Sequence, residues 1–434
     1  MRRGPPTTME LCTAMNPAPA SPATPSARLL LVGGSSGHLR KARASGAEVT
    51  WCQFPGEIRP EHSALAAEII PVDYTDWTQL RPLVLKAQEQ AAFAAAVSLT
   101  EPGLDPAARV NDLLGLAGTS YEVSHRFTDK WLMRRRLAET AAPGTPVVAT
   151  ALFTGRDSLK GFGAEHGYPV IVKPTSGTAS FGVLKVDGAD EADAACQQVS
   201  RLRASGHPLI GAYDVDRFII EKFVEGPLYS AESFSFDGHH VVMAITEAIT
   251  DQRNHVHVGH AIPGRMTAES EATVVEAVRG FLDAMGFRDG PAHTEFKLSP
   301  RGPVVIESQN RVGGALLSTM IEALYGTDPQ ALVFTWALRQ VPAIADRPAG
   351  HGAATSWLIV AVPGHVREVR GLEEIRAMPS TLAVDLWVGP GDLVRSFDGQ
   401  WDGLGHVATR AATTDEAIRL CQDTLSRLHI ITEP

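Results

Sequence analysis

Short apolar runs alternate with helix-like segments in the first part of the chain. The run LLLVGG at 29–34 predicts a buried strand that ends at a glycine pair, and a second strand is expected at 48–52. Segments 87–99 and 110–116 are expected to be helical or buried. Strands that alternate with helices favour a parallel, doubly wound α/β domain, which we predict over residues 28–125. The glycine-rich sequence GGSSG lacks the GxGxxG spacing of nicotinamide-dinucleotide sites.

The pattern changes from about residue 126, where β-rich runs prevail. Strands are expected at 168–174 and 181–186 around a loop of small residues, and again over 218–248. A hairpin follows at 293–308, and helices are expected at 128–140, 190–204, 270–285 and 314–325. This order of strands and helices is typical of an α+β domain with antiparallel strands.

Both ends of the chain differ from this central part. Residues 1–27 contain six prolines among small residues and are expected to form a disordered tail. Residues 341–350 (VPAIADRPAG) are typical of a linker. The segment 351–434 has its own strand and helix patterns, so we predict a small C-terminal α+β lobe.

Composition narrows the class of protein. The chain has 434 residues, and 39 Lys and Arg against 49 Asp and Glu give a formal net charge of −10. This acidic balance disfavours nucleic acid or an anionic membrane as the main partner, and no run approaches the roughly 18 apolar residues of a spanning helix. The cysteines are far apart in sequence and are expected to be reduced thiols of a cytoplasmic protein: Cys12, Cys52, Cys196 and Cys421.

Two acids in the hairpin are the most informative candidates for chemistry. If the SPRG turn has a three-residue loop, Glu295 and Glu307 lie opposite each other with their side chains on one face. Two carboxylates so close repel each other, and a fold tolerates this repulsion where a cation lies between them. A site with few protein oxygen ligands suits Mg²⁺. A two-residue loop would place the acids on opposite faces, and a solvated hairpin remains the alternative.

The residues after Glu307 favour an anion site beside these acids. Gln309, Asn310 and Arg311 follow directly, and Gly313-Gly314 is expected to open a helix. A guanidinium offers a planar fork for phosphate oxygens, and glycines at a helix start let backbone N–H groups approach an anion.

Two lysines upstream are candidates for the same anion. Lys173 ends a β-branched strand and precedes the small-residue loop 175–182, whose N–H groups can close on phosphates. Lys130 follows Asp129 at a helix start. The segment 221–226 (EKFVEG) leaves a strand, so its free backbone groups and apolar side chains could receive an adenine ring.

In this order and spacing, the motifs resemble those of the ATP-grasp superfamily of carboxylate–amine ligases, over residues 28–340. The resemblance implies an ATP-grasp fold: the N-terminal doubly wound domain, a central domain at 126–340 and the C-terminal lobe. Within the central domain, a lid is expected at 130–222 and the metal and substrate part at 223–340.

The resemblance also implies site residues, with ATP and Mg²⁺ (or Mn²⁺ in its place) as cofactors. ATP would be bound by Lys130, Lys173, Ser176, Gly177, Ser180, Glu221, Lys222, Phe223 and Val224. The metal would be held by Glu295, Glu307 and Gln309, and Arg311 would stabilise an acyl phosphate.

Among these ligases, the chain looks most like the L-amino acid ligases. The features shared are Tyr229-Ser230-Ala231-Glu232, the segment GHAIP at 259–263 and the C-terminal pattern WLIVAVPG…VGPGD. The resemblance implies ATP-dependent formation of an amide bond between an amino acid carboxylate and an amine, with release of ADP and phosphate. The residues expected to border the amino acid substrates are Glu232, His260, Arg311, Gly313, Gly314 and Ala315, the last leaving room for a bulky side chain.

Several alternatives stay open. Gln309 stands where the family usually has Asn, and Leu228 stands where an acid often meets the ribose. His255 and His257 share a strand face and could bind zinc, although no further ligand completes the set. The rival functions are an ATP-grasp ligase of the purine-biosynthetic or biotin-carboxylase type, and a non-catalytic ATP-binding module. The expected partners are small amino acids, without nucleic acid or membrane, and the chain is compatible with a homodimer.

Overall fold

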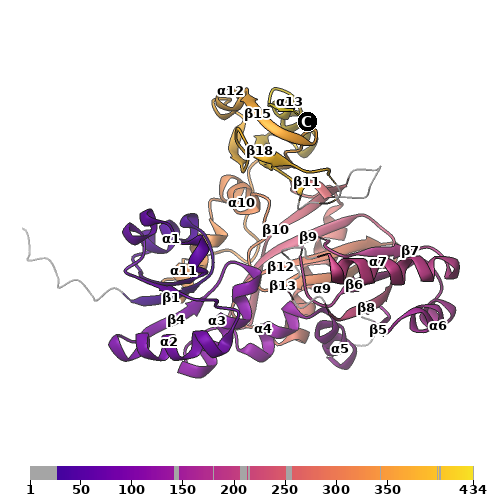
Figure 1. Cartoon of the computed structure of the whole chain (residues 1–434), viewed down its shortest axis with the longest axis horizontal. Coiled ribbons are helices and arrows are strands. Elements are labelled where there is room, and N and C mark those ends of the chain that lie inside the picture. The colour runs from indigo at the N-terminus through magenta and orange to yellow at the C-terminus, as the bar shows by residue number, and fades with distance from the viewer. Residues whose placement is uncertain are drawn as a thin grey trace, which may run out of the picture.

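The computed structural model describes residues 27–140, 146–178, 180–205, 213, 216–250, 257–342, 344–397, 399 and 402–433. The tail expected at 1–27 lies outside these residues except for Ala27. Within the described residues, the strands form four sheets. Figure 1 shows the N-terminal elements on the left, β5–β8 with their helices on the right, and the C-terminal elements at the top, around the long central strands β9–β13.

The N-terminal part is a parallel sheet with strand order β3-β2-β1-β4, as the alternating pattern predicts. Alternate residues of β1 point to opposite faces, so Leu30 packs against α2 and α3 while Leu31 packs against α1. The face of Leu31 is also covered by α11, which comes from far along the chain and lies beside α1 in Figure 1. The bounds are β1 Arg28–Val32, α1 Ser36–Ala44, β2 Glu48–Gln53, β3 Glu68–Pro71, α2 Trp77–Gln90, β4 Phe93–Val97, α3 Glu101–Leu114 and α11 Pro329–Ala337.

The next sheet is antiparallel, with order β5-β8-β6-β7, and α6 and α7 bury its apolar face. β6 and β8 pair so that Lys173 lies beside Ile219 and Ile171 beside Glu221. The elements are α4 Tyr121–Thr128, α5 Lys130–Thr140, β5 Thr150–Phe153, α6 Arg156–His166, β6 Val170–Pro174, β7 Leu184–Val186, α7 Ala192–Ala204 and β8 Phe218–Lys222.

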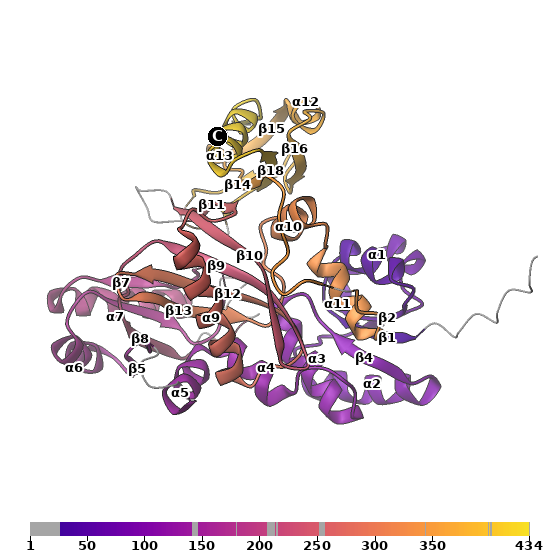
Figure 2. The same ribbon diagram turned by 180° about the vertical axis from the view of Figure 1, so that it is seen from behind.

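The largest sheet has eight strands in the order β13-β12-β9-β10-β11-β14-β18-β16. Helices α5 and α9 cover one face near β12, and α10 packs with β14 on the other side, as the views from front and back show (Figures 1 and 2). The bounds are β9 Leu228–Phe236, β10 His239–Thr250, β11 His257–Ile262, α9 Ala268–Met285, β12 Gly290–Ser299, β13 Gly302–Gln309, α10 Leu317–Tyr325, β14 Ala353–Leu358, β16 Thr381–Leu386 and β18 Gly405–Ala411.

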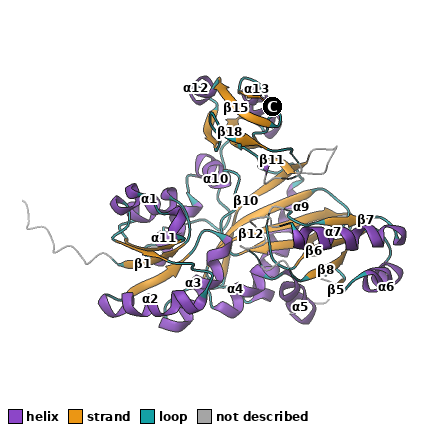
Figure 3. Cartoon of the chain, viewed as in Figure 1, coloured by secondary structure: helices purple, strands orange, loops and turns teal. Residues whose placement is uncertain are grey.

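The C-terminal segment is hydrogen-bonded to the central sheet and is not separate from it. β14 pairs with β11, and β18 and β16 extend the same sheet. The remaining strands form a small sheet of order β17-β15-β19, and the helices there are short (Figure 3). These elements are β15 Gly364–Arg370, α12 Leu372–Arg376, β17 Leu393–Val394, α13 Thr414–Leu425 and β19 His429–Glu433.

The helix expected at 128–140 is confirmed as α5, which begins two residues later, at Lys130. Thr128 ends α4, and the Asp129 carboxylate accepts the N–H of Leu132 in the first turn of α5 at 3.0 Å. Two further local expectations need adjustment. The segment 87–99 holds the end of α2 and the strand β4. The glycine pair 313–314 precedes α10 by one turn, because Ala315 and Leu316 have left-handed φ angles of 52° and 63°. No helix in the described ranges is long and apolar enough to span a membrane.

Candidate active site

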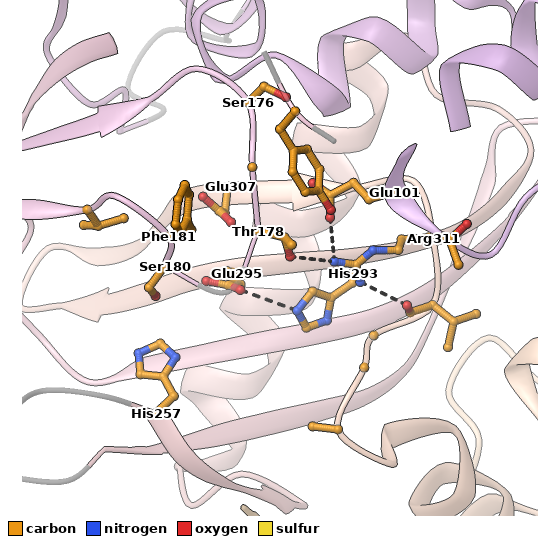
Figure 4. A pocket seen from close by; sticks show the side chains of 18 of the residues that line it. Glu101, Ser176, Thr178, Ser180, Phe181, His257, His293, Glu295, Glu307 and Arg311 are labelled. Atoms are coloured by element: carbon orange, nitrogen blue, oxygen red, sulfur yellow. Dashed lines mark hydrogen bonds and ion pairs between the residues drawn. The ribbon is translucent and has the colours of Figure 1, made fainter. Parts of the chain in front are cut away.

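A cavity of about 900 Å³ lies where the three larger sheets meet. It brings together most of the residues that the sequence analysis singled out. Figure 4 shows Glu295, Glu307 and Arg311 among them. Those on its wall are Lys130, Lys173, Ser176, Gly177, Ser180, Glu221, Lys222, Phe223, Val224, His260, Glu295, Glu307, Arg311, Gly313, Gly314 and Ala315. Two others, Glu232 and Gln309, are buried just behind the wall.

Glu295 and Glu307 are paired across β12 and β13, as expected, but for a different reason. The turn contains only two residues, because Ser299 pairs with Gly302. This register would set Glu295 opposite Ile306, but a bulge between Glu295 and Phe296 adds one residue to β13 and restores the pairing with Glu307. The three-residue loop was wrong; the shared face of the two acids stands.

The chemistry of this acid pair fits a hard divalent cation. Gln309 donates from Nε2 to Oε1 of Glu307 at 3.0 Å, whereas its own Oε1 is buried without a hydrogen-bond partner. An orphaned amide oxygen beside two carboxylates is a suitable oxygen donor. No cluster of three or more His, Cys, Asp and Glu that could hold a metal occurs among the described residues. Two carboxylates and one amide oxygen suit Mg²⁺, which takes few protein ligands and completes its shell with water and phosphate.

Positive charges surround Glu307. Lys130 Nζ lies 3.5 Å and Lys173 Nζ 3.9 Å from Oε2 of Glu307. Burial lowers the pKa of Lys130, but the carboxylates of Glu307 and Glu101 outweigh burial and raise that pKa above its ordinary value. Lys130 is therefore an ammonium group, and the two lysine side chains lie together in a buried cleft, which suits them to a polyanion.

Lys130 also anchors the small-residue loop over the cavity. Its Nζ donates to the Gly177 carbonyl at 2.7 Å, and its backbone N–H donates to the Thr175 carbonyl at 2.7 Å. Gly177 has a φ of 124°, which favours glycine. The expected phosphate loop 175–182 thus lies beside Lys130, apart from residue 179, which is outside the described residues.

Glu221 is the centre of a buried ion-pair network. It accepts from Arg134 Nε at 2.6 Å and from Lys173 Nζ at 2.8 Å, and all three residues are at most 4 % exposed. Burial alone would raise the pKa of Glu221, but the charges of Arg134 and Lys173 lower it to about 2. Its side chain is thus already committed to two cations.

The segment after Glu221 forms an apolar corner of the cavity. Lys297 Nζ donates to the Val224 carbonyl at 2.9 Å and lies 4.3 Å from the centre of the Phe223 ring. The Lys222 ammonium turns to the carbonyls of Gly167 and Tyr168, each at 3.2 Å. The carbonyl of Val224 is therefore already hydrogen-bonded, while the Phe223 ring and the Val224 side chain remain on the wall.

Arg311 projects into the cavity from the loop after β13. Its Nη2 donates to Glu101 Oε2 at 2.9 Å and to Thr178 Oγ1 at 3.3 Å (Figure 4). Burial opposes the charge of Arg311, but Glu101 outweighs burial and raises the guanidinium pKa. Arg311 thus links the N-terminal domain to the small-residue loop.

Glu232 and His293 are paired on adjacent strands β9 and β12. His293 Nδ1 lies 2.8 Å from Oε1 of Glu232, and its Nε2 lies 3.6 Å from Oε1 of Glu295. Burial would lower the pKa of His293, but Glu232 above all raises it to about 10. Glu232 lies behind His293, which itself is on the wall, and a direct contact of Glu232 with a substrate stays a prediction.

The cavity wall also carries the residues expected near an amino acid. His260 lies on β11, its Nδ1 is buried without a hydrogen-bond partner, and burial lowers its pKa to about 3. Gly313 is closely packed, since an added Cβ would lie 2.8 Å from His293 Nδ1 and 2.9 Å from Glu232 Oε2. His255 lies outside the described residues, so the zinc alternative at His255 and His257 has no described pair.

Glu101, His293 and Arg134 are among the residues in or behind the cavity wall that the sequence analysis did not single out. Glu101 is the first residue of α3, and His293 begins the HTE sequence that contains Glu295. These positions beside recognisable sequence features could have pointed to both residues. Arg134 lies one helical turn after Lys130, and that i, i+4 spacing could have suggested that both face the acids.

Comparison with known proteins agrees with this geometry. Residues 166–319 match the ATP-grasp domain family, and residues 356–433 match the L-amino acid ligase C-terminal domain 2 family. The L-arginine-specific L-amino acid ligase of Bacillus subtilis is 21 % identical over 327 residues, which cover 74 % of this chain and 76 % of the relative. Alanine–anticapsin ligase of B. subtilis strain 168 is 25 % identical over 264 residues, covering 58 % of this chain and 55 % of the relative.

A solved structure shares the fold over nearly the whole chain. The crystal structure of an L-amino acid ligase from Bacillus licheniformis has a TM-score of 0.80 at 21 % identity and covers 94 % of this chain and 99 % of that one. The resemblance drawn from the motifs, the ATP-grasp fold class and the expectation of an enzyme are therefore confirmed. The chain therefore contains an ATP-grasp domain and an L-amino acid ligase C-terminal domain, and it is similar to L-amino acid ligases in sequence and in fold.

Proposed function

We propose that this protein joins the carboxylate of one amino acid to the amine of another, with ATP converted to ADP and phosphate. The observation that carries the proposal is the convergence of Lys130, Lys173, Glu307 and Arg311 on one cavity, whose wall also carries the neutral His260. The cationic and acidic residues suit a nucleoside triphosphate with its metal, and the cavity of about 900 Å³ leaves room for small organic substrates as well.

The cationic residues account for the phosphoryl-transfer half of the reaction. Lys130 and Lys173 attract the ATP phosphates, and the loop held by Lys130 closes over them and excludes water. Glu295, Glu307 and the amide oxygen of Gln309 would hold Mg²⁺, which when bound neutralises phosphate charge during transfer. We propose that Phe223 and Val224 contact the adenine ring. Glu221 serves the site through its ion pairs with Arg134 and Lys173.

Arg311 and the residues after it account for the amide-forming half. A carboxylate is a poor electrophile, and transfer of the γ-phosphoryl group gives it a good leaving group as an acyl phosphate. The Arg311 guanidinium stabilises the charge on that phosphate and on the oxyanion formed when the amine attacks. His260, Gly313, Gly314 and Ala315 lie around the amino acid substrates, and the neutral His260 ring can accept a hydrogen bond from the attacking amine.

The rival ATP-grasp ligases share the nucleotide residues but take other acceptors. The L-amino acid ligase C-terminal domain at 356–433 supports amino acid substrates over a purine precursor or bicarbonate. The paired acids and Arg311 support catalysis over a purely ATP-binding role.

A screen of amino acid pairs for ADP release, with mass spectrometry of the products, tests the proposal. We expect at least one pair to give ADP and the matching dipeptide in equal amounts. Glu307→Gln serves as the inactive control, because it removes one carboxylate of the acid pair without changing side-chain size. Turnover only with a purine precursor, or with bicarbonate plus biotin, would contradict the proposal.

A further inference from the structure

The position of Glu307 depends on a single extra residue in β13. With two residues in the turn, a regular ladder would place Ile306 opposite Glu295. The bulge shifts the register by one, and a shift of one residue moves a side chain to the other face of the sheet. Whatever fixes this bulge therefore decides whether the two acids share one face.

Arg134 binds the bulge directly. Its Nη1 donates to the carbonyl of Val305 at 3.0 Å, and its Nη2 donates to the carbonyl of Ile306 at 2.6 Å. Both carbonyls are part-buried and belong to β13, the edge strand of its sheet, so a donor from outside the sheet can reach them. The planar guanidinium can serve two carbonyls at once. Glu221 accepts from the remaining Nε at 2.6 Å, which fixes the orientation of the fork.

The side chain of Arg134 is not on the cavity wall, so it has no direct path to a substrate. It is 3 % exposed and lies one helical turn from Lys130, whose Nζ is 3.5 Å from Glu307. One face of α5 thus makes two contacts around Glu307. Arg134 binds the backbone just before Glu307, and Lys130 lies beside the Glu307 carboxylate.

We propose that Arg134 is a positioning residue for the divalent-cation site: by fixing the bulge at Ile306, it holds the Glu307 carboxylate beside Glu295. The inference rests on the proposed function, since it assumes that these acids hold Mg²⁺. It assigns Arg134 a task that is separate from its ion pair with Glu221.

The first test is Arg134→Lys, which keeps a positive charge beside Glu221 but loses the fork. Arg136→Lys is the matched control, because Arg136 lies on the same helix and donates to the Ala284 carbonyl at 2.9 Å, away from the bulge. Mn²⁺ binding is measured by electron paramagnetic resonance in the presence of ADP, and ADP binding without metal is measured by calorimetry. We expect Arg134→Lys to weaken Mn²⁺ binding about tenfold or more, and to change metal-free ADP affinity by less than about threefold.

Equal Mn²⁺ affinity in the wild type and Arg134→Lys would overturn the positioning role. Failure of the wild type to bind Mn²⁺ at all would instead contradict the proposed function and the inference that rests on it. Weakening of Mn²⁺ binding by Arg136→Lys to the same extent would show a general effect of α5 and would also overturn the role.

Deletion of Ile306 supplies a second measurement that does not depend on Arg134→Lys alone. Without the extra residue, the two-residue turn sets Glu307 opposite Glu295 in a regular ladder. Arg134→Lys should then change Mn²⁺ affinity by less than about twofold in the deletion background. A loss as large as in the full-length chain would mean that Arg134 acts through Glu221, and it would overturn the proposal.

Discussion

Nη2 of Arg311 lies 2.9 Å from Oε2 of Glu101, although 210 positions separate the two residues along the chain. The pair joins the N-terminal domain to the loop after β13 at the cavity wall. It also means that Arg311 is neutralised by a protein carboxylate when no anionic substrate is bound.

Arg311→Ala should lower kcat by about 100-fold or more, because the acyl phosphate loses its guanidinium contact. The change also leaves Glu101 buried without its partner, which by itself destabilises the fold. The double variant Arg311→Ala, Glu101→Gln should therefore recover thermal stability without recovering kcat. ADP release and thermal unfolding measure the two effects, and a rate that recovers together with stability would remove Arg311 from its proposed role.

Glu221→Ala should destabilise the protein by about 3–5 kcal/mol, because it leaves Arg134 and Lys173 buried without their carboxylate. Urea unfolding measures this change. Glu139→Gln is the matched control: its ion pair with Arg135 is more than half exposed, so a loss of at most about 1 kcal/mol is expected. Similar losses for the two variants would argue against the network around Glu221.

Ala315→Leu should shift substrate preference toward small amino acids, because it adds three carbons to the cavity wall. We expect the ratio of kcat/KM for a bulky over a small substrate to fall about tenfold or more. Ala315→Gly is the control for backbone effects, since the φ of 52° at this position suits glycine. An unchanged preference in Ala315→Leu would place residue 315 away from the substrate side chain.

Stability should fall as the solution becomes acidic, in part through His406. Burial lowers the pKa of His406 from an ordinary 6.5 to about 4, so the unfolded chain takes up this proton first as the pH falls. The contribution is complete above about pH 6.5 and is lost as the pH falls toward 4, by about 2 kcal/mol between pH 7 and pH 5.

Urea unfolding of His406→Gln at the two pH values checks this expectation, since the variant should lose less stability on acidification than the wild type. The exposed His429→Gln should behave like the wild type. Equal pH dependence in His406→Gln and the wild type would contradict the assignment.

Local sequence identified many of the residues that line the cavity. The lysines and Arg311 followed from their motifs, whereas the pairing of Glu295 with Glu307 was predicted from a three-residue loop and arises from a two-residue turn and a bulge. The bulge at Ile306 could not be foreseen, because its carbonyls are satisfied by Arg134 from a helix that is distant in sequence. A hairpin considered alone contains no sign of such a donor.

Contacts between distant segments also limited how much of the fold could be predicted. The parallel N-terminal sheet was predicted because its strands and helices alternate along the chain. That α11 covers its face, and that β14 bonds to β11, depends on long-range pairing that residue patterns do not encode. The pattern at 351–434 correctly indicated strands, but it could not say which sheet they would join.

The pairing of β11 with β14 has a consequence for how the protein can be dissected. β11 carries His260, and among the described residues its outer hydrogen-bonding edge is closed by β14, which follows the 341–350 segment. A truncation in that segment would leave the backbone of β11 open to pairing with other chains. The proposed substrate role of His260 and the resistance to aggregation thus depend on the same ladder of hydrogen bonds, so we expect removal of the C-terminal lobe to affect both.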